Sequence, residues 1–189
     1  MSTSAGLSPQ PGLAPTNLSF RPATVQDAES LASIYAHYVL THTVTFETEP
    51  PSAMEMNRRR TVIMDANMPY LVAEAAGRVI GYGYAGSYRP RAAYRFTLED
   101  SIYLDPTWTG RGVGRALLGE LIAASEAAGF RQMIAVIGDS ANTPSVKLHA
   151  RLGFTHVGTL RDVGFKFGRW LDTVIMQRAL HPPSDSRQP

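Results

Sequence analysis

The chain has 189 residues, a length that fits one domain with a sizeable core. Hydrophobic residues make up 44% and charged residues 18%, as in ordinary globular domains, and the formal net charge is only +2. There is no cysteine, which excludes disulfides and a thiol nucleophile. The five histidines are scattered, so we expect no metal site. No apolar run approaches the roughly 20 residues of a membrane helix. The Arg58–Arg60 run lies in an amphipathic segment and is expected to be a solvated helix face, with no nucleic acid or membrane as partner.

The two ends of the chain differ in composition from its middle. Residues 1–17 are rich in Ser, Pro, Gly and Ala, without the basic start and apolar stretch of a signal peptide. Residues 181–189 carry Pro182 and Pro183. We therefore expect a disordered tail at each end, one domain over residues 18–180, and a cytoplasmic location.

Hydrophobic spacing predicts strands and helices in a mixed order. Thr24 and Asp27 have the spacing of a capping box before an apolar helical repeat. Pro106 ends a strand, and Gly129 and Gly153 follow expected helix ends. Strands are expected at 18–21, 70–74, 79–85, 95–104, 133–137, 155–160 and 170–177, and helices at 28–38, 52–68, 112–128 and 144–152. This order indicates one α/β domain around a mixed sheet.

The segment from Ile102 to Leu118 predicts a strand, a glycine-rich loop and an amphipathic helix. Glycines let backbone N–H groups approach an anion, and the helix N-terminus adds a favourable dipole, so the segment suits a pyrophosphate. It is not a Walker loop, because no Gly-Lys-Ser/Thr follows, and no acidic residue ends the next strand as a dinucleotide fingerprint requires.

A second segment, from Asn142 to Phe154, opens a helix with an Asn, which by itself is also an ordinary cap. Together the two segments resemble the GNAT superfamily of N-acetyltransferases. The first is similar to its pyrophosphate loop, Gln/Arg-x-x-Gly-x-Gly/Ala, and the second to its Asn-x-x-(Ala/Pro)-x-x-x-Tyr-x-x-x-Gly-Phe helix. More narrowly, residues 20–180 resemble the phosphinothricin and methionine sulfoximine acetyltransferases, with matching pieces at 44–50, 82–87, 97–103, 135–138 and 164–170.

The resemblance implies an α/β (α+β) acyl-CoA N-acyltransferase fold, with a central mixed, mostly antiparallel sheet flanked by helices. It implies transfer of an acetyl group from acetyl-CoA to a small amino-acid-like amine, and a homodimer. A splayed strand would admit the pantetheine arm, and backbone N–H groups near Ile102 and Leu104 would form an oxyanion hole. The expected cofactor-binding residues are Ile102, Tyr103, Leu104, Gly110, Arg111, Gly112, Val113, Gly114, Arg115, Asn142 and Ser145. Thr109 departs from the pattern, because the loop usually has Gln or Arg there.

Two catalytic residues are expected from the resemblance. Glu99 matches the general base of the subfamily, acting directly or through a water, whereas Asp100 points to the opposite strand face and is the poorer candidate. His149 stands at the usual Tyr position, where it either protonates the departing thiolate or packs as a helix histidine against the sheet.

The acceptor is expected to be held on its anionic group. Arg89 and Arg95 precede Glu99, and a guanidinium fork suits a carboxylate or phosphinate. Phe46, Glu47 and Lys166 are further candidates to line the acceptor pocket. Two alternatives stay open, namely acetylation of a protein N-terminus or lysine, and a non-catalytic acyl-CoA-binding protein, although a binding module needs neither Glu99 nor His149.

Overall fold

The computed structural model describes residues 17–181, so the two expected tails lie outside the described residues except for their innermost positions. The described strands are β1 (Ser19–Pro22), β2 (Tyr70–Ala75), β3 (Arg78–Ser87), β4 (Thr97–Leu104), β5 (Gln132–Gly138), β6 (Thr155–Lys166) and β7 (Arg169–Ala179). The α-helices are α1 (Ala28–Thr41), α2 (Ala53–Asp65), α3 (Val113–Ala127) and α4 (Thr143–Arg151). None of the helices in residues 17–181 is long and apolar enough to span a bilayer.

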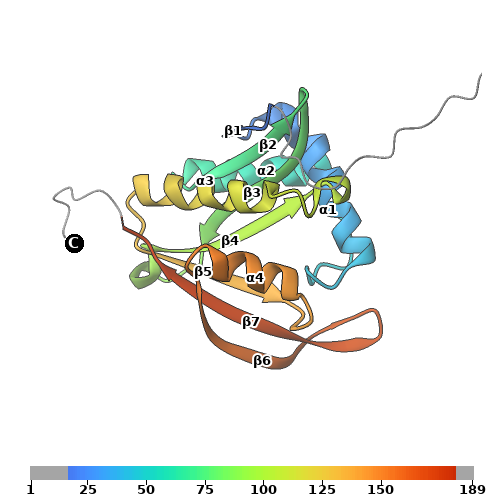
Figure 1. Cartoon of the computed structure of the whole chain (residues 1–189), viewed down its shortest axis with the longest axis vertical. Helices are drawn as coiled ribbons and strands as arrows, with labels where there is room; N and C mark the ends of the chain where they lie inside the picture. Colours follow the sequence, from blue (N-terminus) through green and yellow to red (C-terminus); the bar gives the residue numbers. More distant parts are fainter. Residues whose placement is uncertain (1–16, 182–189) are drawn as a thin grey trace, which may run out of the picture.

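The strands form one sheet in the order β1-β2-β3-β4-β5-β7-β6 (Figure 1). Every neighbouring pair is antiparallel except β4 and β5, which run parallel and are joined by the α3 crossover. The expected mixed, mostly antiparallel sheet flanked by helices is confirmed.

The helices cover both faces of the sheet. One core cluster joins α3 to the middle of the sheet through Leu118, Leu121 and Met133. A second cluster joins α1 and α2 to β2 and β3 on the other face, with Leu31 and Met56 among its buried residues. Because helices protect both faces, each face of the central strands can form a separate site.

Several expected strand boundaries were wrong. The strand expected from residue 95 begins at Thr97, because residues 92–94 form a 3₁₀ turn and Arg95 has helical dihedral angles (φ −55°, ψ −19°). The last two strands are longer than expected, since β6 and β7 pair from Thr155 to the turn before Arg169 and form one long hairpin.

The glycine loop has the local geometry expected of it. Gly112 caps the N-terminus of α3 with φ +81°, and Gly110 has φ +73°, both in the left-handed region that an L side chain rarely adopts. The loop can therefore turn sharply from β4 into α3 and leave its backbone N–H groups exposed.

Candidate active site

The central feature of the site is the separation of β4 from β5. The two strands pair from Thr97 to Asp100 on β4, and the last pair joins Asp100 to Ala135. Beyond this pair both strands continue, to Leu104 and Gly138, without pairing to each other. The backbone edges of the two strand ends are thus free to bind a ligand between them.

A groove of about 580 Å³ lies at this separation. The ends of β4 and β5, the glycine loop and α4 line it, together with Tyr38 and Val44. Of the residues expected to bind cofactor, Ile102, Tyr103, Leu104, Gly110, Gly112, Gly114, Arg115, Asn142 and Ser145 line the groove. The side chains of Arg111 and Val113 do not, because the Arg111 guanidinium lies over the Trp108 ring and Val113 is fully buried in the core.

At the α3 end of the groove, both backbone groups and side chains can attract an anion. The N-terminus of the 15-residue helix α3 points into it. The space beside Gly110 and Gly112 is open, since a Cβ at either position would meet no atom within 4 Å. Arg115, Lys147 and Arg151 add positive charge, and none of them is in a salt bridge with another described residue. This combination of a helix N-terminus and unpaired cations suits a polyphosphate.

Two groove residues use their side chains to support the local backbone. Asn142 Oδ1 accepts a hydrogen bond from Ser145 N at 3.4 Å, so the side chain caps α4. Thr109 Oγ1 donates to the Pro106 carbonyl at 2.9 Å, which stabilises the turn before the glycine loop. Thr109 therefore does not take the place of a charged or amide side chain directed at the cofactor.

His149 lies at the base of the groove and is only 5% exposed. Its Nδ1 lies 2.8 Å from the Ser145 carbonyl oxygen and its Nε2 lies 3.0 Å from Asp100 Oδ2. Burial lowers the pKa of His149, but the hydrogen bond and the charge of Asp100 raise it, and the net result is a pKa above the usual value. His149 is packed against the sheet, as one of the two sequence-based interpretations stated, and it also faces the groove.

Glu99 lies on the other face of β4 and does not line the groove. Its register partner on β3 is Gly86, and the next pair on the same face of the two strands is Tyr84–Ser101. The pKa of Glu99 is raised to about 7, chiefly by burial and also by the neighbouring Asp100 carboxylate, while the Arg89 guanidinium opposes the rise. A carboxyl group with a pKa near neutrality can both accept and release a proton at physiological pH.

The five expected acceptor residues do not converge on one cavity. Arg89 and Arg95 are exposed, and their guanidinium groups lie over the rings of Tyr88 and Phe96. Of the two, only Arg89 acts electrostatically on Glu99. Arg95 Nη1 bonds the Ala92 carbonyl within its own turn.

Phe46, Glu47 and Lys166 belong to one structural unit around the loop after α1. The Phe46 ring lies so close to Gly138 and Gly164 that a Cβ at Gly164 would overlap it. Glu47 accepts hydrogen bonds from Arg59 Nη1 at 2.6 Å and from the Tyr35 hydroxyl at 3.0 Å.

Lys166 is 4% exposed and donates to the carbonyl oxygens of His42 and Thr45 at 2.9 and 2.8 Å. Its ammonium group thus holds the loop that carries Phe46 and Glu47.

Several groove residues were missed from the sequence. Lys147 and Arg151 are four residues apart on α4, a helical spacing that places them on one face and could have been recognised. Tyr38 could not, because its hydroxyl donates at 2.6 Å to the carbonyl of Leu104, which is 66 residues later. This bond attaches α1 to the end of β4 that does not pair with β5.

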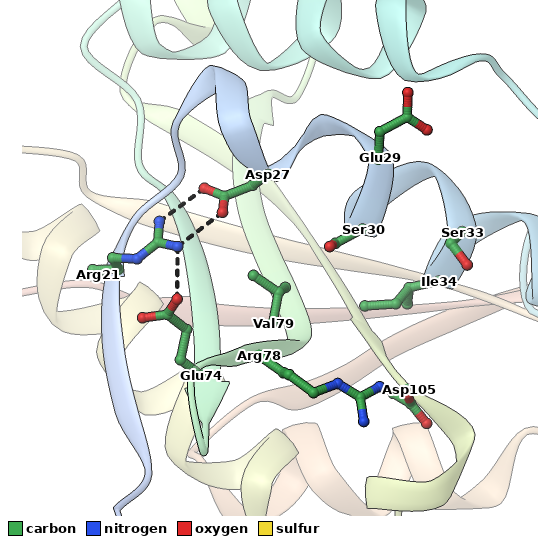
Figure 2. Close-up of a pocket in the computed structure, with 11 residues that line it drawn as sticks. Arg21, Asp27, Glu29, Ser30, Ser33, Ile34, Glu74, Arg78, Val79 and Asp105 are labelled. Carbon is green, nitrogen blue, oxygen red and sulfur yellow. Dashed lines mark hydrogen bonds and ion pairs between the residues drawn. The ribbon is translucent and has the colours of Figure 1, made fainter.

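A second surface depression lies beside β1 and the β2–β3 turn (Figure 2). Figure 2 shows the Arg21 side chain between those of Asp27 and Glu74. Both Asp27 carboxylate oxygens and one Glu74 oxygen accept hydrogen bonds of 2.8 Å from the Arg21 guanidinium nitrogens. These ion pairs connect β1 to the start of α1 and to β2.

The family model of the acetyltransferase (GNAT) domain matches residues 20–175. A phosphinothricin N-acetyltransferase of Alcaligenes faecalis is 56% identical over 155 residues, which cover 82% of this chain and 79% of that protein. An L-methionine sulfoximine/L-methionine sulfone acetyltransferase of Pseudomonas aeruginosa is 38% identical over 165 residues, 87% of this chain and 95% of that protein.

A crystal structure of a phosphinothricin acetyltransferase from Sinorhizobium meliloti in complex with acetyl-CoA has a TM-score of 0.86 and 46% identity. The match covers 92% of this chain and 94% of that chain. By sequence and by structure, the chain belongs to the GNAT family of acetyltransferases, in its phosphinothricin and methionine sulfoximine acetyltransferase branch.

Proposed function

We propose that this acetyl-CoA-dependent N-acetyltransferase acetylates the amine of a small amino-acid-like acceptor of the phosphinothricin or methionine sulfoximine type, by direct transfer in a ternary complex. The observation that carries the proposal is the division of functions across β4. A groove suited to acetyl-CoA opens where β4 leaves β5, and the carboxyl group of Glu99 lies on the opposite face of the same strand. Relatives named for these acceptors support the substrate class.

In the proposed complex, the glycine loop and the α3 N-terminus hold the pyrophosphate, and Arg115, Lys147 and Arg151 neutralise further phosphate charge. The pantetheine arm lies between the strand ends, and backbone N–H groups near Ile102 and Leu104 receive the thioester oxygen. The acceptor approaches from the α1 and α2 face.

The proposed acetyl transfer uses groups on both faces of β4. Glu99 takes a proton from the acceptor ammonium, and the free amine attacks the thioester carbonyl carbon. The tetrahedral intermediate collapses with cleavage of the carbon–sulfur bond, the thiolate leaves with the electron pair and is protonated, and the second proton of the former amine nitrogen is released to solvent. Because the chain has no cysteine, we propose no acyl-enzyme step through a thiol.

We propose that Arg89 binds the anionic group of the acceptor, because its guanidinium group acts on Glu99 and has no salt-bridge partner among residues 17–181. An anion held there leaves the neighbouring amine close to the base, which lowers the entropic part of the barrier. Arg95 is the weaker candidate, since its side chain bonds its own turn.

The test is a thiol-release assay with acetyl-CoA and a panel of amino acids and analogues, including phosphinothricin and methionine sulfoximine. Each acceptor is compared with its methyl ester or decarboxylated amine, which removes the anion. We expect the anionic compounds to be used far more efficiently, with intersecting double-reciprocal lines. Equal efficiency with the neutralised compounds would favour a peptide, a polyamine or an arylamine, and parallel lines would refute direct transfer.

We also propose that the protein is a homodimer and that its second copy covers the β6–β7 hairpin. Large apolar side chains are exposed along this hairpin, namely Val157, Leu160, Val163, Phe165, Phe167 and Trp170, each between 52% and 63%. So many apolar groups on one exposed element indicate an interface. Light scattering after size-exclusion chromatography would give the mass, and Phe165→Ser with Trp170→Ser should shift it to a monomer.

The expected cytoplasmic location belongs to the same proposal, because acetyl-CoA must be supplied on the side of the membrane where it is made. Cell fractionation would test it.

A further inference from the structure

The carboxylate of Asp100 lies where the cofactor groove begins. Asp100 forms the last β4–β5 pair, with Ala135, and its side chain lines the groove base. The residue is 6% exposed. Its Oδ2 bonds His149, whereas its Oδ1 is buried and has no hydrogen-bond partner among the described residues. A buried carboxylate is unfavourable unless it is paired, and His149 is the hydrogen-bond partner that Asp100 has there.

The contacts of His149 fit its protonated form. The Ser145 carbonyl oxygen can only accept, so Nδ1 donates to it, and Nε2 of a protonated ring donates to the Asp100 carboxylate, whose hydrogen bond and charge raise the pKa of His149. An imidazole that donates from both nitrogens is an imidazolium. The Phe154 ring packs edge-on against it, with ring centroids 5.0 Å apart, and fixes the ring plane.

Few other charged groups face this pair. Glu99 precedes Asp100 on the same strand but projects to the other face, and Ala135, the register partner of Asp100 on β5, contributes only apolar surface. Lys147 and Arg151 on α4 are exposed. Asp100 is the charged residue that acts on His149.

We propose that Asp100 is a positioning residue that holds His149 at the base of the groove as an oriented imidazolium, from which the departing thiolate takes its proton. The inference rests on the proposed function. When the carbon–sulfur bond breaks, the electron pair goes to sulfur, and the proton that His149 Nε2 donates to Asp100 Oδ2 before the reaction moves to the thiolate, while the former amine nitrogen releases its second proton to solvent. His149 becomes neutral, Asp100 stays a carboxylate, and solvent returns the proton.

The same carboxylate also acts on the proposed base. Asp100 raises the pKa of Glu99 and that of His149, so removing its charge lowers both. The acidic limb of the pH–rate profile reports Glu99, which must be deprotonated, and the alkaline limb reports His149, which must be protonated. Loss of the Asp100 charge should therefore move both limbs to lower pH. Arg89 opposes the effect on Glu99 and remains in place.

The experiment uses Asp100→Asn in the full chain, because an amide oxygen can still accept from His149 Nε2 and only the charge is lost. We expect both limbs of the kcat profile to move to lower pH, and kcat at pH 8 to fall by about 10- to 100-fold, within the usual range for acid–base catalysis. Imidazole NMR of the same protein should show a lower pKa for His149. The control is Asp65→Asn, which makes the same charge change at the exposed end of α2.

An unmoved alkaline limb, or an unchanged His149 titration in a folded Asp100→Asn protein, would overturn the inference. Asp100→Asn in a His149→Gln background provides a second test at pH 8, where Glu99 is deprotonated with or without the Asp100 charge: two residues acting through one proton should then cause no further loss of kcat together. The wild-type acceptor assay separates the two levels. Activity with an unshifted profile refutes this inference alone, whereas no N-acetyltransferase activity with any amine refutes the proposed function and the proton delivery with it.

Discussion

Replacement of Glu99 by Gln should make the protein less active and more stable at alkaline pH. In the folded state, burial and, to a smaller extent, the Asp100 carboxylate raise the pKa of Glu99 from 4.5 to about 7. The folded protein therefore binds this proton more tightly than the unfolded chain, and its stability falls as the pH rises from about 4.5 to about 7. A shift of about 2.5 units at about 1.36 kcal/mol per unit corresponds to about 3 kcal/mol at pH 8. The partial exposure of Glu99 makes this an upper value.

Glu99→Gln removes this ionisation and keeps the shape of the side chain. We expect thermal unfolding to show that the free energy of unfolding rises by up to about 3 kcal/mol at pH 8. It should hardly change at pH 4, where the wild-type carboxyl group is protonated in both the folded and the unfolded state. The turnover number should fall by about 10²- to 10⁴-fold, while calorimetry shows unchanged acetyl-CoA binding. If the free energy of unfolding of the variant rises equally at both pH values, the stabilisation is not electrostatic. A variant that turns over at the wild-type rate would show that the base lies elsewhere.

Three further changes address the remaining groups. Gly112→Val should weaken acetyl-CoA binding in calorimetry, because a side chain at φ +81° costs roughly 1–2 kcal/mol and displaces the loop backbone; unchanged affinity would refute the phosphate site. Arg89→Lys should raise the KM for amino-acid acceptors more than the KM for acetyl-CoA, since Lys offers a point charge in place of a fork; an equal effect on both would contradict anion binding. Lys147→Gln with Arg151→Gln should raise the KM for acetyl-CoA and reduce its salt dependence, with no change for the acceptor.

Local signals in the sequence were enough to predict much of the fold. The glycine loop and the helix after it follow from residues near in sequence, and the structure begins α3 at Val113 with Gly112 as its cap. Strand alternation predicted that Glu99 and Asp100 face opposite sides, and the groove contains Asp100 and not Glu99. These features depend on backbone geometry within one segment.

Features that join distant segments could not be read in this way. The bond between His149 and Asp100 spans 49 residues, and no local pattern marks it. Lys166 was expected to face the acceptor, yet its ammonium bonds two carbonyls more than 120 residues earlier, because the long β6–β7 hairpin returns beside the loop after α1. Arg95 was placed on a strand, since its neighbours have strand composition, but the turn at 92–94 delays the strand.

The alternation along β4 has a consequence for how the enzyme can change. Even-numbered positions such as Leu98 and Asp100 direct their side chains toward α3 and α4, and odd-numbered positions such as Glu99 and Tyr103 toward α1. A substitution at one position can thus alter acceptor preference and leave cofactor use unchanged, or the reverse. A deletion of one residue before Glu99 would exchange the two carboxylates between the faces and remove both functions together. Within this strand, adaptation can proceed by point substitution but not by a shift of register.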